Sequence, residues 1–507
     1  MKVIGRLIKK TTGIGFKRIN RKQLSYRNQL DVLLSIIKKA QNTEFGFFHG
    51  FKSLIGTRDV VSRFQNEVPI MDYEEFHDRW LHKSIEGQSD SIWPGKIKYY
   101  ALSSGTTGSP SKRIPVSMEM IRSFQRSSLR QYSVLHALDL DEDFFSASGL
   151  AVGGTTQLKK RNKHYEGDLS GILKKHTTLL IRPMTKPGDK IASLSDWNEK
   201  LDRMVEKAPE WNIGIVAGIP SWCLMLMERI IHRHQLSSIH DIWPNFRVYV
   251  HGGVYMDPYT ARLQRICKKE VYLFDTYLAS EGYFGFQIHP NQPGMKLLIN
   301  NGIFFEFIPF DSRFFNEDGE LISQYKALTI SEVKENVDYA LVISTNAGLW
   351  RYLIGDLVRF VDVADYRIII SGRIKQFLSL CGEHLSLDNL NHAFQSLIDQ
   401  RLVSGSEFTI MVEKEAMYHH WFIELENPEQ DSSMLQKTLD NRLFELNDDY
   451  RSARKYSLNP PKITGIKPGT FYAYMQSLGK VGAQHKLPRV MNEEQSKSWF
   501  AFLENPR

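Results

Sequence analysis

The chain has 507 residues, of which 42% are hydrophobic and 24% charged, a composition typical of a globular protein large enough for two or more domains. Residues 1–22 contain eight cations and no acid, and they account for the whole net charge of +8, because the remaining chain has 57 charges of each sign. We therefore expect no nucleic-acid binding and no membrane binding by the body of the protein.

The basic amino-terminal segment is expected to be a solvated helical face. Lys9, Lys10, Thr11 and Thr12 interrupt its apolar positions, so it lacks the apolar core of a secretory signal. No apolar run approaches the length of a membrane span. The three cysteines are scattered singly, which indicates buried thiols rather than a disulfide framework or a metal site. A cytoplasmic location is expected.

Residues 24–130 mix amphipathic helical patterns with aromatic-rich turns, which predicts a helical cap. Within this stretch, residues 97–102 predict a strand and residues 117–121 predict the start of a helix. The loop between them, Ser103 to Pro115, is rich in hydroxyls and glycine and is closed by Lys112 and Arg113. Such a loop can present N–H groups, hydroxyls and cations to phosphate. A flexible surface loop is the plainer alternative.

The loop is not a Walker loop. That motif needs Gly-Lys-Ser or Gly-Lys-Thr, whereas Gly108 is followed by Ser-Pro-Ser before the first lysine. A P-loop kinase or GTPase is therefore disfavoured.

From about residue 145 to 370, short apolar runs alternate with helix-like segments, which predicts an α/β domain. The predicted strands are 178–181, 213–218, 247–250, 341–344 and 367–370. Beyond residue 373 two strand-like runs, 408–412 and 421–425, precede a helical run at 433–447, which predicts a smaller α+β domain. We expect a large domain over residues 1–374 and a small domain over residues 375–507.

Two glycine- and aromatic-bearing segments follow predicted strands. His251-Gly252-Gly253-Val254 would let a flat ring or a phosphate lie close to the backbone, although a tight turn would look the same. In the run from Asp275 to Gly285, Tyr277 could stack on a base, Ser280 could donate to phosphate and Glu281 could hold Mg²⁺. These aromatics could equally belong to the core.

Two further segments carry charge. In Trp350 to Phe360, Gly355 allows a turn and Asp356 would present a carboxylate that can accept both hydroxyls of a ribose; an Asp-containing turn is the alternative. Near the carboxyl end, Lys486 and Arg489 lie in a polar, glycine-bearing stretch, where a lone lysine is usually a surface charge.

Taken in this order, the segments resemble the adenylate-forming superfamily of acyl-CoA synthetases, luciferases and adenylation domains. In particular they resemble the auxin-responsive Gretchen Hagen family of acyl-acid amido synthetases, as a bacterial-type member. Ser103 to Pro115 reproduces the family's Ser-Ser-Gly-Thr and Lys-x-Ile-Pro pattern. The other matches are Tyr277, Ser280, Glu281 and Gly285, then Tyr352, Gly355 and Asp356, then Gln484, Lys486, Pro488 and Arg489. Leu278, Ala279 and Leu353 depart from the family pattern.

The resemblance implies an adenylate-forming fold, in which a large multi-layer domain with β-sheets flanked by helices carries a small α+β carboxyl-terminal domain. It also implies a reaction with ATP and Mg²⁺: a carboxylic acid is joined to AMP, pyrophosphate leaves, and the acyl group passes to an amine, for which an amino acid is expected. The implied site residues are Lys486 and Glu281 for catalysis, with Glu281 on Mg²⁺; Ser103, Ser104, Thr106, Thr107 and Ser280 on the phosphates; Gly252, Gly253 and Tyr277 on adenine; and Asp356 and Arg373 on the ribose.

The resemblance further implies that the small domain rotates between the two half-reactions, about a hinge assigned to Lys375. Two other functions stay open. An acyl-CoA or aryl-CoA ligase would share the first step and use a thiol acceptor, and a nucleotide-binding regulator would have lost catalysis. The expected partners are the small-molecule substrates alone, bound by a monomer.

Overall fold

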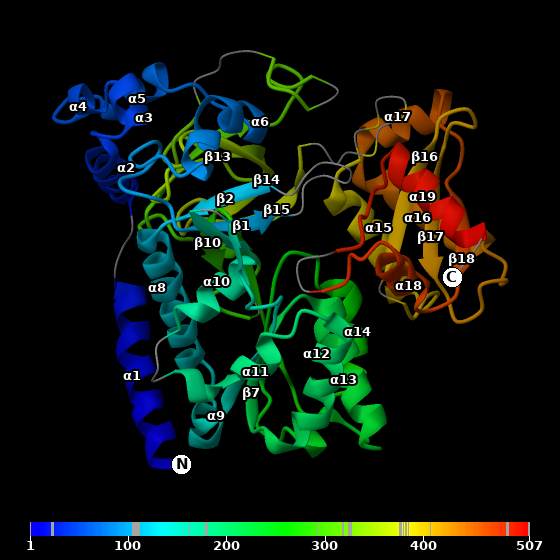
Figure 1. Cartoon of the computed structure of the whole chain (residues 1–507). Helices are drawn as coiled ribbons and strands as arrows, with labels where there is room; N and C mark the ends of the chain where they lie inside the picture. The colour runs from blue at the N-terminus through cyan, green and yellow to red at the C-terminus, as the bar shows by residue number, and fades with distance from the viewer. Residues whose placement is uncertain are drawn as a thin grey trace.

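The protein, described as a computed structural model, comprises a large domain and a smaller carboxyl-terminal domain beside it (Figure 1). The structure describes residues 2–21, 25–103, 112–161, 163–177, 181–290, 292–316, 319–322, 327–374, 378, 380, 383, 385–405, 407–482 and 486–504. Its strands form three sheets, of eleven, four and three strands. The large domain contains the first two sheets, and the small domain contains the third.

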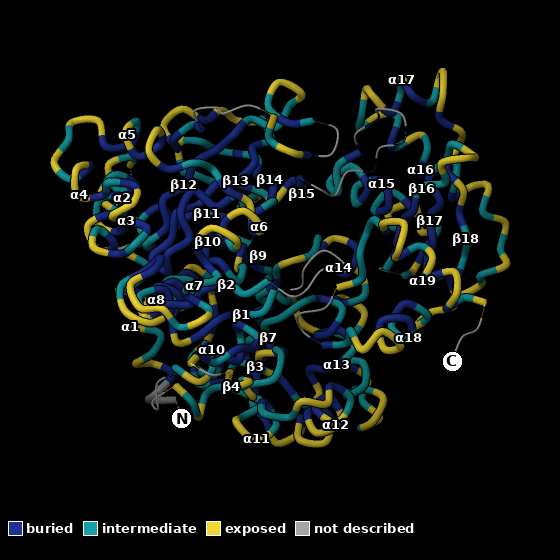
Figure 2. The backbone as a smooth tube through the Cα atoms, turned by 45° about the horizontal axis from the view of Figure 1, so that its top comes forward, coloured by how far each residue is buried: buried dark blue, intermediate teal, exposed yellow. Residues whose placement is uncertain are grey.

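The eleven-stranded sheet has the order β12-β13-β14-β15-β11-β10-β9-β8-β7-β3-β6. Its strands from β9 to β6 pair in parallel, and those from β9 to β12 pair antiparallel. The strands are β3 (Ser148–Val152), β6 (Thr185–Lys186), β7 (Ile213–Gly218), β8 (Val248–His251), β9 (Tyr272–Ala279), β10 (Gly282–Phe286), β11 (Met295–Leu297), β12 (Ile303–Pro309), β13 (Asp338–Thr345), β14 (Tyr352–Asp362) and β15 (Arg367–Arg373). Figure 2 shows that β10 to β14 lie almost wholly inside the domain.

The four-stranded sheet contains the segment predicted as a phosphate loop. Its order is β2-β1-β5-β4, with β1 (Tyr99–Ser103), β2 (Lys112–Val116), β4 (Lys159–Arg161) and β5 (His164–Gly167). Lys112 and Arg113 lie on β2 and pair with Ser103 and Leu102 of β1, so both described ends of the predicted loop belong to paired strands. Burial of the β2 side chains after Arg113 favours this extended backbone.

Helices surround both sheets of the large domain. The expected helical cap over residues 24–130 is interrupted: the helices run as far as residue 85, the chain then contributes β1 and β2 to the four-stranded sheet, and it becomes helical again at Met118. The helices are α1 (Lys2–Arg21), α2 (Tyr26–Ala40), α3 (Glu44–Phe48), α4 (Phe51–Leu54), α5 (Val60–Glu67), α6 (Tyr73–Phe76), α7 (His82–Ile85), α8 (Met118–Val134), α9 (Glu142–Ser146), α10 (Leu169–Lys175), α11 (Asp189–Ala192), α12 (Trp197–Lys207), α13 (Pro220–Arg233) and α14 (Asp257–Arg265). Short turns are η1 (His77–Leu81), η2 (Leu135–Ala137), η3 (Arg182–Met184), η4 (Ala208–Glu210) and η5 (Ile239–Asp241).

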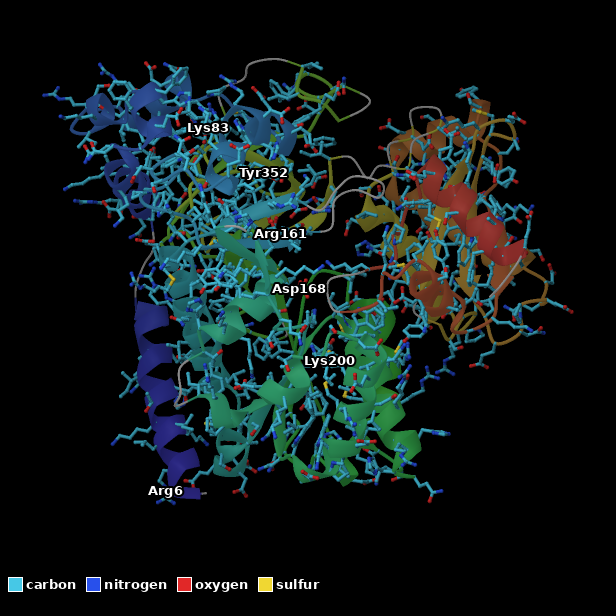
Figure 3. All side chains as sticks on the ribbon, viewed as in Figure 1. Arg6, Lys83, Arg161, Asp168, Lys200 and Tyr352 are labelled. Atoms are coloured by element: carbon cyan, nitrogen blue, oxygen red, sulfur yellow. The ribbon has the colours of Figure 1, made fainter. Side chains whose placement is uncertain are left out.

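The basic amino-terminal segment forms α1, which packs against α8 and α9. Its glycines permit close contact, because a Cβ on Gly5 would lie 2.1 Å from the carbonyl oxygen of Glu142. Arg6, labelled in Figure 3, pairs with the Glu142 carboxylate at 2.8 Å. Leu7 and Ile14 are exposed on the outer side of the helix. Within the described parts of the chain, no helix has the length and apolar character needed to cross a bilayer.

The carboxyl-terminal domain has a core of its own. Its sheet, β16-β17-β18, is built from β16 (Phe408–Glu413), β17 (Tyr418–Glu424) and β18 (Lys462–Ile466). Its helices are α15 (Leu387–Asp399), α16 (Ser433–Leu446), α17 (Asp448–Tyr456), α18 (Thr470–Ser477) and α19 (Glu493–Glu504). Phe408 and Trp421 stack at 5.2 Å inside this core. The predicted small α+β domain is confirmed as a separate body in Figure 1.

Candidate nucleotide-binding and catalytic site

The candidate site lies at one edge of the large sheet, where four neighbouring parallel strands end. β9, β8, β7 and β3 are adjacent and run in the same direction, so their carboxyl ends share this edge. The residues at or just after these ends are Gly153, Gly218, Gly252 and Ser280. Ligands of open α/β sheets bind outside the carboxyl ends of the strands. The fold therefore presents a candidate binding edge that includes the predicted Gly252, Gly253 and Ser280.

Lys486 of the carboxyl-terminal domain reaches this edge. Its Nζ donates a hydrogen bond of 2.8 Å to the carbonyl oxygen of Gly253. Gly253 has φ of +80°, and a Cβ there would lie 2.5 Å from the ammonium nitrogen, so the close approach requires glycine. Burial of the ammonium group, followed by repulsion from Arg373, lowers the pKa of Lys486 to about 8, and attraction to Asp356 opposes this. The residue as a whole stays exposed, so water weakens the effect.

Asp356 is held by two partners from different strands. Its carboxylate accepts a hydrogen bond of 2.7 Å from the Tyr277 hydroxyl and another of 2.7 Å from Nε of Arg373. Asp356 of β14 and Arg373 of β15 are direct partners in the ladder, which fixes the ion pair. The neighbouring Asp356 charge is the main cause that raises the pKa of Arg373. Half of the Arg373 side chain is open to solvent.

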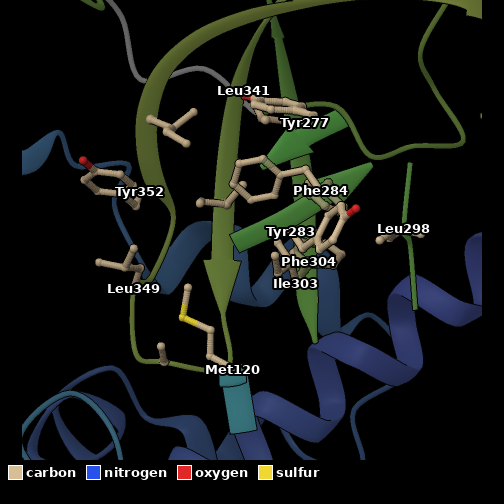
Figure 4. Close-up of a cluster of buried hydrophobic side chains, with 14 of the residues drawn as sticks. Met120, Tyr277, Tyr283, Phe284, Leu298, Ile303, Phe304, Leu341, Leu349 and Tyr352 are labelled. Carbon is tan, nitrogen blue, oxygen red and sulfur yellow. The ribbon is translucent and has the colours of Figure 1, made fainter. Parts of the chain in front are cut away.

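The Tyr277 ring lies in the core. Only 3% of the residue is exposed, and its ring meets Phe284 edge-on at 4.7 Å, as Figure 4 shows. In this conformation its hydroxyl positions Asp356, while the next side chain, Leu278, is 46% exposed. Stacking of Tyr277 on adenine stays a prediction.

Glu281 lies between β9 and β10 and is buried, with 6% exposure. Burial raises the pKa of Glu281 to about 7, and repulsion from Asp356 adds to this, against attraction from Arg373 and Lys112. A divalent cation would relieve the repulsion. Among the described residues no group of three or more His, Cys, Asp or Glu side chains could enclose a metal. Mg²⁺ commonly takes one or two carboxylates together with substrate phosphates, so Glu281 fits such a site.

The remaining predicted residues divide into two groups. Ser103 ends β1 and Ser280 follows β9, and both are partly exposed. Ser104, Thr106, Thr107, the predicted hinge Lys375 and Gln484 lie outside the described residues. The geometry thus joins Lys486 to Gly253, and Asp356 to Tyr277 and Arg373, through direct contacts. Electrostatic interaction links Lys486 to the Asp356–Arg373 pair and links Glu281 to the same pair.

Sequence reasoning missed two features near this edge. His251, the residue before Gly252, is 6% exposed, and burial lowers the pKa of its imidazole to about 4. Its Nδ1 has no hydrogen-bond partner among the residues that the structure describes, and it lies 3.5 Å from Oδ1 of Asp275. The second feature is the contact between Tyr259 and Glu407, which joins the two domains beside Lys486. Neither residue lies in a sequence motif that predicts this contact.

We expect replacement of Glu281 by glutamine to separate stability from activity. The raised pKa means that the folded state binds the Glu281 proton more tightly than the unfolded chain, so this carboxyl destabilises the fold as pH rises from about 4.5 through 7. E281Q should therefore be more stable than the parent by about 1–3 kcal/mol at pH 8 and by much less at pH 4.5. Urea denaturation at both pH values measures this difference.

In the same variant, ATP–pyrophosphate exchange should fall by at least about ten-fold if the carboxylate holds Mg²⁺. E429Q, which alters an exposed glutamate, is the control. An equal change of stability at both pH values would contradict the raised pKa.

Family models match most of the chain. The GH3 family N-terminal domain matches residues 25–157 and 153–271, the central domain residues 296–367 and the C-terminal domain residues 387–495. The matched residues include Tyr352, Gly355, Asp356 and Lys486, while Glu281 and Arg373 fall between the matches.

Individual proteins show the same likeness. A jasmonoyl-L-amino acid synthetase of Nicotiana attenuata is 24% identical, over 92% of this chain and 91% of its own. An indole-3-acetic acid-amido synthetase of Arabidopsis thaliana is 26% identical over 50% of this chain and 45% of its own. Among solved structures, an acyl acid amido synthetase has a TM-score of 0.74 at 19% identity, covering 99% of this chain and 96% of its own. A 2-hydroxyisobutyryl-CoA ligase has a TM-score of 0.62 at 13% identity, covering 94% and 90%.

Proposed function

Since the chain belongs to the GH3 family, we propose that it is an AMP-forming acid–amino acid ligase. In the first half-reaction an oxygen of the carboxylic acid attacks the α-phosphorus of ATP, and pyrophosphate leaves. In the second, the amine of an amino acid attacks the acyl carbon, AMP leaves, the amine loses a proton and an amide forms. The names of the jasmonoyl- and indole-3-acetic acid-linking relatives support this reaction class.

Lys486 supplies positive charge to the first half-reaction. The carboxylate and the α-phosphate are both anions, so their approach and the charge that grows on phosphorus call for a fixed cation. The single observation that carries the proposal is the hydrogen bond from Lys486, across the domain boundary, to Gly253 at the edge where four parallel strands end.

The nucleotide is held by residues around that lysine. Asp356, kept in place by Tyr277 and Arg373, accepts hydrogen bonds from the ribose hydroxyls, and the Gly252-Gly253 turn lies against adenine. The hydroxyls of Ser103, Ser104, Thr106 and Thr107 hold the phosphates, and Ser280 adds a donor. Mg²⁺, held by Glu281 and the phosphates, supplies further positive charge when bound.

The two domains carry separate tasks in this proposal. The large domain, residues 1–374, binds the nucleotide and the acid, and the small domain, residues 375–507, brings Lys486 for adenylation and rotates about Lys375 for transfer. The end of β15 at Arg373 supports this boundary, because β15 is the last strand along the chain that belongs to the large sheet. The protein is proposed to act as a monomer in the cytoplasm.

The acceptor can be tested directly. With an acid that supports ATP–pyrophosphate exchange, we expect turnover with amino acids that yields AMP and an amide. The matched relatives support this expectation, because they include a jasmonoyl-L-amino acid synthetase and an indole-3-acetic acid-amido synthetase. Mass spectrometry of products formed with CoA or with an amino-acid mixture measures the outcome. Thioester with CoA and no amide would instead assign an acyl-CoA ligase, and no exchange with any acid in a broad panel would favour a regulator.

A further inference from the structure

Beside the Lys486 contact, a second polar contact joins the two domains. The Tyr259 hydroxyl of α14 donates to Oε1 of Glu407, and Arg489 donates from Nη1 to Oε2 of Glu407 at 2.8 Å. Nη2 of Arg489 also donates to the Tyr259 hydroxyl at 3.2 Å. All three side chains are largely buried, with exposures of 1% for Tyr259 and of 12% and 17% for the Arg489 and Glu407 side chains.

The segment that carries Lys486 is fixed to the small domain just beyond it. The carbonyl oxygen of Pro488 accepts from Oγ1 of Thr409 at 2.7 Å, and that of Arg489 accepts from the Ile410 amide at 2.9 Å. The Met491 amide donates back to Ile410 at 2.8 Å. The strand-like segment 488–491 therefore lies along β16 of the small domain. The position of β16 thus decides where the Lys486 side chain can reach.

The two interdomain contacts lie on the same two segments. Gly253 and Tyr259 are on the stretch that leaves β8 and enters α14, and Lys486 and Arg489 are on one stretch of the small domain. In Figure 1 the segment coloured toward the red end of the bar reaches the green helix α14. Where Tyr259 holds Arg489, Lys486 is brought against Gly253.

We propose that Tyr259, Glu407 and Arg489 are positioning residues for the first half-reaction, which hold the small domain where Lys486 reaches the adenylation site. This inference rests on the proposed role of Lys486. These three side chains hold the small domain in the arrangement for adenylation, and they are divided between the two domains when the small domain moves away. Glu407 and Arg489 are both in the small domain, so their ion pair moves with it and stays satisfied. Tyr259 alone remains on the large domain.

Because the two charged groups lie on the small domain and only the tyrosine lies on the large domain, the contact can be broken and formed again. Separation of the domains breaks the bonds of one hydroxyl, which water can replace, and leaves no isolated charge behind. An ion pair whose two charges have no other partners would have to be broken at every cycle. Arg359 and Asp388 do form an ion pair across the boundary, at 3.7 Å, but Arg359 also pairs with Asp338 of its own domain at 2.9 Å. Another interdomain bond, from the Tyr472 hydroxyl to Asn198 at 2.6 Å, joins two uncharged side chains in the same way.

The test separates the two half-reactions. In Y259F, we expect ATP–pyrophosphate exchange with a substrate acid to fall about ten-fold, the effect of losing hydrogen bonds to charged groups. Single-turnover transfer from chemically prepared acyl-adenylate to the amino acid should stay within about two-fold of the parent, because transfer does not need the adenylation arrangement. E407Q, which keeps the shape of the side chain and removes its charge, should show the same division.

The chain offers a matched control. Tyr450 is fully buried and donates to Asp440 at 2.7 Å, and Arg454 pairs with the same carboxylate at 2.8 Å, all inside the small domain. Y450F removes an equivalent bond that does not cross the boundary, so it should change thermal stability and leave the ratio of the two half-reaction rates unchanged.

Each outcome decides the inference. Equal loss of both half-reactions in Y259F and E407Q, or no loss in either, would overturn it. The proposed function fails separately: it fails if K486A retains full exchange, whatever Tyr259 does. If K486A loses exchange while Y259F and E407Q keep the parental ratio of the two half-reaction rates, the proposed function stands and only the positioning role is wrong.

Discussion

Replacement of Lys486 by alanine is expected to lower the rate of adenylate formation by about 10²–10³-fold, the usual cost of removing a group that stabilises transition-state charge. The ammonium group would no longer offset the repulsion between the acid and the α-phosphate. The Km for ATP should change much less, because Asp356 and Arg373 remain in place. ATP–pyrophosphate exchange measured over a range of ATP concentrations separates the two effects.

Two comparisons make this result specific. K467A removes an exposed lysine of the same domain and should retain parental exchange. Because the pKa of Lys486 is lowered to about 8, the parent should lose exchange activity as pH rises through about 8, when the ammonium group deprotonates. In K486R the residual activity should lack this alkaline decline, since arginine stays charged. Parental exchange in K486A would show that another cation acts at the phosphate.

The largest effect on stability is expected from Glu306, which lies fully buried on β12 against Arg351. Nε of Arg351 lies 3.1 Å from both carboxylate oxygens, and Nε2 of Gln65 donates to Oε1 at 2.9 Å. E306A would leave the Arg351 charge buried without a counter-ion. We expect a loss of about 3–5 kcal/mol in the free energy of unfolding, measured by urea denaturation.

The same substitution should reach the site indirectly. Arg351 directly precedes β14, the strand that carries Asp356, and its Nη1 also bonds the carbonyl oxygens of Gln65 and Val68 at 2.8 and 2.7 Å. E493A, which breaks an exposed pair with Lys497, is the control and should leave the free energy of unfolding nearly unchanged. A loss in E306A no larger than in this control would show that the buried pair contributes little.

Local patterns predicted most of the architecture. Apolar runs at 213–218, 247–250, 341–344 and 367–370 correspond to β7, β8, β13 and β15, because buried strands need continuous apolar residues whatever their neighbours. The predicted strand at 178–181 lies outside the described residues except for Ile181, which precedes η3. Two predictions were wrong in part: the helical cap over residues 24–130 is interrupted by β1 and β2, and residues 112–115, predicted as loop, lie on β2. The glycine and hydroxyl content of the preceding residues hid the sequence pattern of that strand.

The site could be predicted less fully than the fold. Its motifs singled out Asp356 and Lys486, but their partners depend on register and on domain placement, which local sequence does not encode. Asp356 meets Arg373 because β14 and β15 pair at those residues, and Tyr259 meets Glu407 because α14 faces the small domain. Neither contact follows from residue type or spacing.

The glycines at the carboxyl ends of the parallel strands bear on how such an enzyme can diversify. Gly252 cannot take a side chain, since its Cβ would lie 2.3 Å from the carbonyl oxygen of Thr276, and a Cβ on Gly218 would lie 2.8 Å from Sγ of Cys223. The surface proposed to bind the nucleotide is thus formed by main-chain atoms. Its shape is maintained by the packing of the strands rather than by contacts with the ligand. Substitutions of side chains elsewhere around the site would leave this main-chain surface intact. New substrates can therefore be acquired without loss of the shared reaction with ATP.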